Sequence, residues 1–76
     1  MEKINYESLE QNFKVITNDF IKGCKGSIEL AILKGNNELK VKEQIKVEVM
    51  IAAQKMLKAA YLKTKQEELV WIMKKN

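Results

Sequence analysis

Residues 6–22 read YESLEQNFKVITNDFIK and carry an apolar side chain at every third or fourth position. The series consists of Tyr6, Leu9, Phe13, Ile16 and Phe20. Spacings that alternate between three and four residues place side chains on one face of an α-helix. Asn5 is suited to cap its first turn, and Ile4 is placed to pack against Leu9. Because Gly23 favours a helix end, the sequence predicts a helix over residues 6–22.

The next segment, residues 23–42, fits two local structures. In the favoured one, residues 23–26 form a turn, Ser27 caps a short helix over 28–34, and Gly35 ends that helix in the left-handed conformation. The alternative is a β-hairpin over residues 27–42. Apolar side chains alternate on both sides of the sequence KGNN at 34–37, which is suitable turn chemistry. The sequence leaves both interpretations open, and both bury the segment.

From Asn37 onward the spacing predicts a long helix with two neighbouring apolar stripes. One stripe is Ile45, Val49, Ala52, Met56 and Ala59, and the other is Met50, Ala53, Leu57 and Ala60. A wide apolar face is typical of a helix that contacts more than one neighbour. The β-branched residues between 41 and 51 lower helix propensity and keep a strand near 39–47 as the alternative.

Residues 63–68 read KTKQEE, a polar run that interrupts the apolar stripes. Thr64 and Glu67 have the spacing of a capping box, so the favoured interpretation is a break followed by a last helix over 65–75. The absence of glycine and proline leaves one continuous helix over about 38–75 as the alternative. The predicted fold is mostly α: a single domain over residues 1–76 with three or four helices, with the β-hairpin at 27–42 as a variant.

The composition argues against an enzyme. The 76 residues include no histidine and a single cysteine, so most nucleophile–base pairs and histidine metal sites cannot form. We therefore expect no catalytic residue, no cofactor and no metal ligand. Cys24 is interpreted as a small residue in a turn that ends a helix. One cysteine, no long apolar run and no signal sequence favour a cytoplasmic protein without a membrane partner.

The net charge of +4 comes from the half of the chain after Asn37. All fourteen basic residues are lysine, which attracts phosphate but reads base edges less well than arginine. The candidates for nucleic-acid contact are Lys55, Lys58, Lys63 and Lys65. The favoured interpretation is that these lysines keep an exposed helix face soluble, because glutamates are interspersed and no aromatic residues alternate with them.

Two apolar runs exceed what one helix face can bury, at residues 49–53 and 69–73. The candidate interface residues are Leu69, Val70, Trp71, Ile72, Met73, Val49 and Met50. A folded chain of this size exposes roughly 4,800 Å² of the roughly 12,800 Å² exposed when unfolded, which is a thin core. The sequence therefore predicts a small non-enzymatic binding protein, an adaptor, inhibitor or regulator, that forms a homodimer. The alternative is a nucleic-acid-associated protein that uses the lysine-rich second half.

Overall fold

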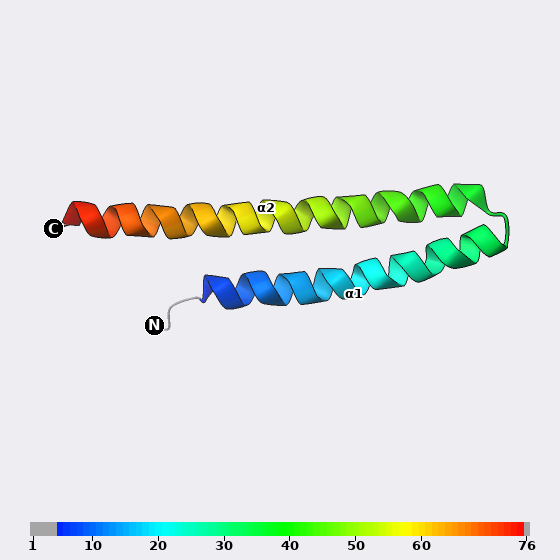
Figure 1. Ribbon diagram of the computed structural model, residues 1–76, viewed down its shortest axis with the longest axis horizontal. Coiled ribbons are helices and arrows are strands. Elements are labelled where there is room, and N and C mark those ends of the chain that lie inside the picture. The colour runs from blue at the N-terminus through cyan, green and yellow to red at the C-terminus, as the bar shows by residue number, and fades with distance from the viewer. Residues whose placement is uncertain (1–4, 76) are drawn as a thin grey trace.

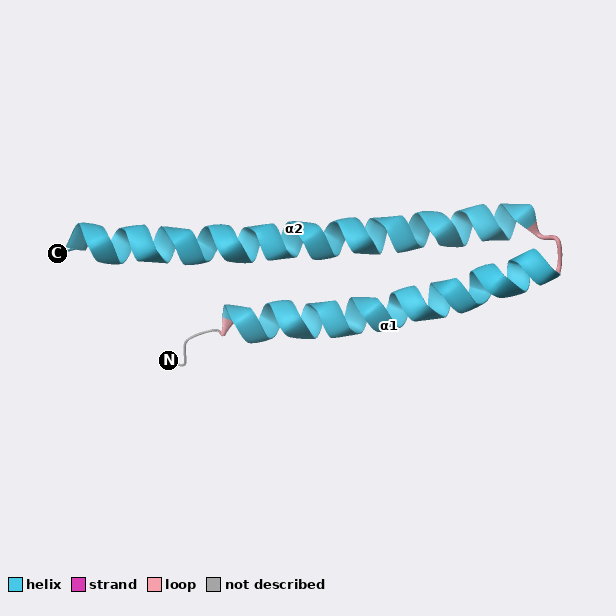
Figure 2. Ribbon diagram, viewed as in Figure 1, coloured by secondary structure: helices cyan, strands magenta, loops and turns pink. Residues whose placement is uncertain are grey.

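The protein is an extended helical hairpin. The computed structural model describes residues 5–75, of Lys75 the backbone alone. Helix α1 (Tyr6–Leu33) and helix α2 (Asn37–Lys75) lie side by side and antiparallel (Figure 1). Residues 5–75 contain no strand, as the colouring of Figure 2 shows. The radius of gyration is 18.2 Å, against about 11 Å for a compact chain of this length. The prediction of an α fold is confirmed, and that of a three- or four-helix domain is wrong.

Helix α1 continues through the glycines that were expected to end it. Asn5 caps it as predicted, because its Oδ1 accepts a hydrogen bond from the Ser8 amide at 3.0 Å. The predicted end at Gly23 and turn at 23–26 are wrong. A glycine costs a helix only about 1 kcal/mol, and contacts of neighbouring turns with α2 offset that cost. Ile4, expected to pack against Leu9, lies outside the described residues.

Gly35 forms the connection between the helices in the way the helical interpretation predicts. Its φ angle is 67°, in the left-handed region that glycine adopts without strain. The amide of Asn36 donates to the carbonyl of Ala31 at 2.8 Å, and that of Gly35 donates to Ile32 at 3.2 Å. These two bonds define a Schellman motif, which ends a helix. The alternative β-hairpin at 27–42 is therefore wrong, because the KGNN sequence terminates a helix instead of connecting two strands.

Helix α2 begins at a polar cap and runs without a break to Lys75. The side chain of Asn36 accepts a hydrogen bond from the Leu39 amide at 3.1 Å, so Asn36 caps the first turn. The favoured break at 63–68 is wrong, and the continuous helix is correct. Lysine, glutamine and glutamate are good helix formers, so the polar run forms exposed helical turns. Thr64 and Glu67 lie within the helix and cap nothing.

The two helices meet along one line of side chains, which we call the seam. It comprises Glu10, Phe13, Thr17, Ile21, Cys24, Ile28 and Ala31 of α1, and Lys40, Glu43, Val47, Met50, Gln54, Leu57, Tyr61 and Thr64 of α2. All are buried or half-buried, and successive members are three or four residues apart. The apolar stripe predicted on residues 6–20 is not the seam, because Phe13 alone of that stripe faces it. No large side chain among the described residues is fully buried.

Candidate interaction surface

One broad side of the hairpin is apolar across both helices. An α-helix turns by about 100° per residue, so the residue before a seam residue lies on the flank of the seam. Because the helices are antiparallel, these preceding residues lie on the same side of the hairpin in both. This side also carries Asn12, Gly23, Ser27, Lys42, Lys46 and Lys63. Its apolar members are Leu9, Ile16, Phe20 and Leu30 of α1, and Leu39, Val49, Ala53, Met56 and Ala60 of α2. We call these apolar members the apolar face.

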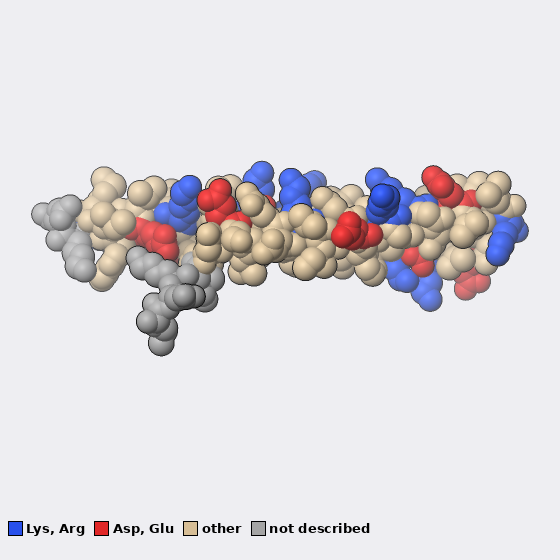
Figure 3. All heavy atoms as spheres, turned by 90° about the horizontal axis from the view of Figure 1, so that it is seen from below, with Lys and Arg blue, Asp and Glu red and all other residues tan. Residues whose placement is uncertain are grey.

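The apolar face is open to solvent in the single chain. Ile16 is 68% exposed and Met56 67%, while Leu9, Phe20 and Val49 are each about half exposed. Figure 3 shows the hairpin edge-on, so that its two broad sides form the upper and lower edges of the picture. Over the middle of the hairpin, lysines gather along the upper edge and uncharged side chains form the lower edge. The charged residues that precede the seam, Lys42, Lys46 and Lys63, lie toward the two ends of the apolar face.

The opposite side of the hairpin is predominantly polar. Residues that follow a seam residue lie there by the same geometry. They include Gln11, Lys14, Asn18, Lys25 and Glu29 of α1, and Gln44, Lys55, Lys58 and Lys65 of α2, which together we call the polar face. Four exposed apolar residues interrupt it, Ile32, Val41, Ile51 and Leu62. The two broad sides of the hairpin therefore differ in polarity, and the larger share of their lysines lies on the polar face.

Hydrogen bonds join the helices near the middle of the seam. The Gln54 amide nitrogen donates to Thr17 Oγ1 at 2.6 Å and to Asn18 Oδ1 at 2.8 Å. Thr17 Oγ1 in turn donates to the carbonyl of Phe13 at 2.7 Å. Both hydrogens of the Gln54 amide nitrogen are thus used. These directional bonds fix the register of α1 against α2.

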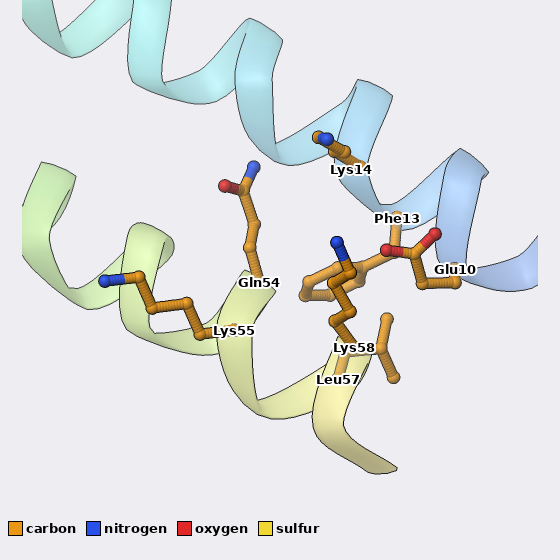
Figure 4. Close-up of a pocket in the computed structure, with 7 residues that line it drawn as sticks. All are labelled: Glu10, Phe13, Lys14, Gln54, Lys55, Leu57 and Lys58. Atoms are coloured by element: carbon orange, nitrogen blue, oxygen red, sulfur yellow. The ribbon is translucent and has the colours of Figure 1, made fainter. Parts of the chain in front are cut away.

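A pocket of about 150 Å³ opens beside these hydrogen bonds, between the helices (Figure 4). Its walls come from Glu10, Phe13, Lys14, Gln54, Lys55, Leu57 and Lys58. In Figure 4 the Gln54 amide reaches from α2 toward α1, whereas the Lys55 side chain points away along α2. The pocket is shallow and mixed in charge, which makes it a poor site for a small molecule.

The structure brings together part of the lysine set that the sequence suggested. Lys55 and Lys58 line the same pocket, joined by Lys14 of α1. Lys65 lies over the ring of Tyr61, with its Nζ 5.9 Å from the ring centre. Lys63 is two residues from Lys65 and points to a different side of α2. Sequence reasoning missed Lys14, because only the pairing of the helices places it beside Lys55 and Lys58.

The run at residues 69–73 lies on the part of α2 that extends past the first turn of α1 (Figure 1). All five side chains are exposed, Trp71 by 66% and Met73 by 76%. Trp71 continues the line of Leu57 and Thr64 at seven-residue intervals, beyond the start of α1. A groove of about 330 Å³ lies beside it on the same helix. Of the other candidates, Val49 belongs to the apolar face and Met50 to the seam.

Cys24 lies in the seam, within α1, and not in the turn that the sequence suggested. It is 5% exposed. Burial, together with hydrogen bonding to the Glu43 carboxylate, raises the pKa of its thiol above the ordinary value of 9.0. Glu43 also accepts a hydrogen bond from Lys46 at 3.1 Å, and this bond lowers the carboxyl pKa below 4.5. The thiol is therefore protonated and shielded, which suits packing better than redox chemistry.

The described residues offer neither a metal site nor a membrane-spanning segment. No cluster of three or more histidine, cysteine, aspartate or glutamate side chains there could hold a metal ion. Neither described helix has an apolar stretch long enough to cross a membrane. Comparisons with protein-family models, with curated proteins and with solved structures found no match. The proposals below therefore depend on the geometry of the hairpin.

Proposed function

We propose that this chain is a non-enzymatic binding protein, acting as a small adaptor, inhibitor or regulator, whose apolar face packs against an α-helical surface of another protein chain, either a different protein or a second copy of itself. The observation that supports this is the division of the hairpin into an apolar and a polar side. Soluble proteins rarely leave a contiguous apolar patch of this extent exposed unless it binds something.

The composition of the apolar face resembles that of a protein interface. Its core holds Leu9, Ile16, Phe20, Val49 and Met56, and the charged residues of the same side are Lys42, Lys46 and Lys63. Interface cores are depleted in charge and enriched in aromatic residues and methionine, with a polar rim around them. Lys42, Lys46 and Lys63 would form part of that rim. The long, straight face suits a helix or a helical layer, which packs by side-chain ridges.

Photo-crosslinking in the native cell tests this proposal. A photoreactive amino acid at Val49 on the apolar face should give covalent adducts with protein. The same residue at Ile51, on the polar face of the same helix, is the matched control and should give few. Equal adducts from both positions, or none from Val49, would contradict the proposal.

A second candidate function is nucleic-acid binding by the polar face. The observation that favours it is the grouping of Lys14, Lys55 and Lys58 around one pocket. If they bind phosphate, replacing all three with glutamine should weaken RNA or DNA binding and flatten its dependence on salt concentration. Replacing Lys34, Lys42 and Lys74, which lie outside the seam and the polar face, removes the same charge elsewhere and is the control. A lack of binding at low salt would eliminate this candidate.

A further inference from the structure

The hairpin exposes more surface to solvent than a compact protein of the same mass. The single chain exposes 6743 Å². A compact monomer of 8.8 kDa exposes only about 4,800 Å². The excess of about 2,000 Å² corresponds to surface that a globular protein of this mass would bury.

The seam buries too little apolar surface to stabilise the hairpin despite this large exposed area. Its buried apolar members are Ile21, Cys24 and Ala31, and the latter two are small. Stability of helices in proteins comes mainly from packing of an apolar face, and small domains with too little core need a partner or a cross-link. The single cysteine leaves the chain without an internal disulfide.

We infer that the occupant of the apolar face is a second copy of this chain, and that two hairpins pack face to face as a four-helix bundle. This inference rests on the proposed function and names its partner. A two-fold symmetric interface needs a self-complementary patch, and an uncharged apolar patch meets that condition without pairing like charges at its core.

The area available fits a stable dimer. Two separate hairpins expose twice 6743 Å², whereas a compact protein of twice 8.8 kDa exposes about 7,900 Å². A fully compact dimer would therefore bury about 5,600 Å² in total. Even half of this value lies above the roughly 2,000 Å² at which obligate dimer interfaces begin.

The charges of the helices select an arrangement. Helix α1 carries three lysines against four acidic residues, and α2 carries nine lysines against five glutamates. Packing α1 onto α2 of the second copy puts unlike net charges in contact and leaves the two basic helices diagonal to each other. For face-to-face hairpins, this requires a two-fold axis along their length, with both turns at the same end.

Sedimentation equilibrium of the full chain tests the inference. Wild type should have a mass of twice 8.8 kDa at micromolar concentration. Val49→Lys with Met56→Lys places four lysines in the symmetric interface and should weaken dimerisation by about 100-fold or more. Ile51→Lys with Leu62→Lys makes the same changes on the polar face, and its dissociation constant should stay within about threefold of wild type.

A wild-type chain that remains monomeric at high micromolar concentration would overturn the inference, and this result does not depend on the folding of any variant. A trimer or larger assembly would also overturn it, as would equal effects of the two double variants. A monomeric wild type leaves the proposed function standing if Val49 still crosslinks to another protein in the cell. Absence of all crosslinks would remove the proposed function instead.

Spin labels test the arrangement. In a Cys24→Ser background, a label at Lys34→Cys marks the turn. The distance between the two labels in the dimer should be well under half of the 64 Å length of the hairpin. A label distance close to that full length would show the turns at opposite ends and overturn the inferred packing of α1 on α2.

Discussion

The seam and the apolar face use different chemistry. At the seam, Thr17, Cys24 and Glu43 are buried, and Gln54 bonds across to α1. On the apolar face, Ile16 and Met56 are about two-thirds exposed. The chain thus buries polar groups at the seam and leaves large apolar side chains exposed outside it. The seam therefore specifies how the helices pair, while the apolar face holds most of the surface whose burial would stabilise them.

Energetic magnitudes support this division. Full burial of a leucine, isoleucine or phenylalanine side chain contributes about 1.5–3 kcal/mol, whereas a hydrogen bond contributes about 1 kcal/mol net. Leu9, Ile16 and Phe20 lie outside the seam, so the single hairpin forgoes the contribution of burying these three side chains. The account therefore expects a weakly stable hairpin on its own and a stable one when the apolar face is covered.

The largest expected effect comes from enlarging the most buried side chain of the seam. Ala31 is 1% exposed, next to the turn. Ala31→Leu should separate the helices there and lower the free energy of unfolding by about 1–3 kcal/mol, measured by urea unfolding. Ala59→Leu adds the same atoms on an exposed surface of α2 and should change stability by less than about 0.5 kcal/mol. A neutral Ala31→Leu would show that the seam is not tightly packed.

A smaller effect is expected at the turn, which determines the faces that meet. Gly35→Ala should destabilise the hairpin by about 1 kcal/mol, because its φ of 67° disfavours a Cβ. Gly26→Ala, inside α1 with nothing within 4 Å of the added Cβ, should instead stabilise it by about 0.5–1 kcal/mol. Thermal unfolding of both variants measures whether each substitution lowers or raises the stability of the hairpin. The same sign for both would contradict the Schellman turn.

The smallest effect concerns pH and the polar part of the seam. Hydrogen bonding from Lys46, followed by that from Cys24, lowers the pKa of Glu43 below 4.5 in the folded state. The ionised carboxylate thus favours folding above pH 4.5, and this contribution is lost as the pH falls through the lowered pKa. The stability difference between wild type and Glu43→Gln should therefore shrink in acid. Glu48→Gln, at an exposed position, is the control and should show a smaller pH dependence.

Local signals in the sequence predicted the start of α1 and the Gly35 turn, because Asn5 and Gly35 act within a few residues of themselves. The helix starts predicted at Ser27 and Thr64 are wrong, because both residues lie inside a helix. The continuation of α1 through Gly23 and Gly26 could not be predicted, because contacts with α2 decide it. The break predicted at residues 63–68 was wrong for a related reason. A polar run indicates that a segment is exposed to solvent, and an exposed segment can remain helical.

The candidate surface was predicted in part. Val49 and residues 69–73 belong to apolar runs longer than one helix face can bury, so the sequence predicted that some of them are exposed. The structure shows them exposed. The sequence did not reveal that Leu9, Ile16 and Phe20 join Val49 on one side. That requires knowing that Thr17 and Gln54, polar residues without an apolar spacing signal, form the middle of the seam.

Solvent accessibility of side-chain methyl groups in solution tests the central claim most directly. A soluble paramagnetic agent broadens the NMR signals of exposed methyls, so wild-type protein needs no substitution. The account predicts that Ile16 and Met56, 68% and 67% exposed in the single hairpin, are protected at concentrations where the dimer forms, while Leu62 stays accessible. Ile16 and Met56 as accessible as Leu62 at every concentration would contradict the claim that a second copy covers the apolar face.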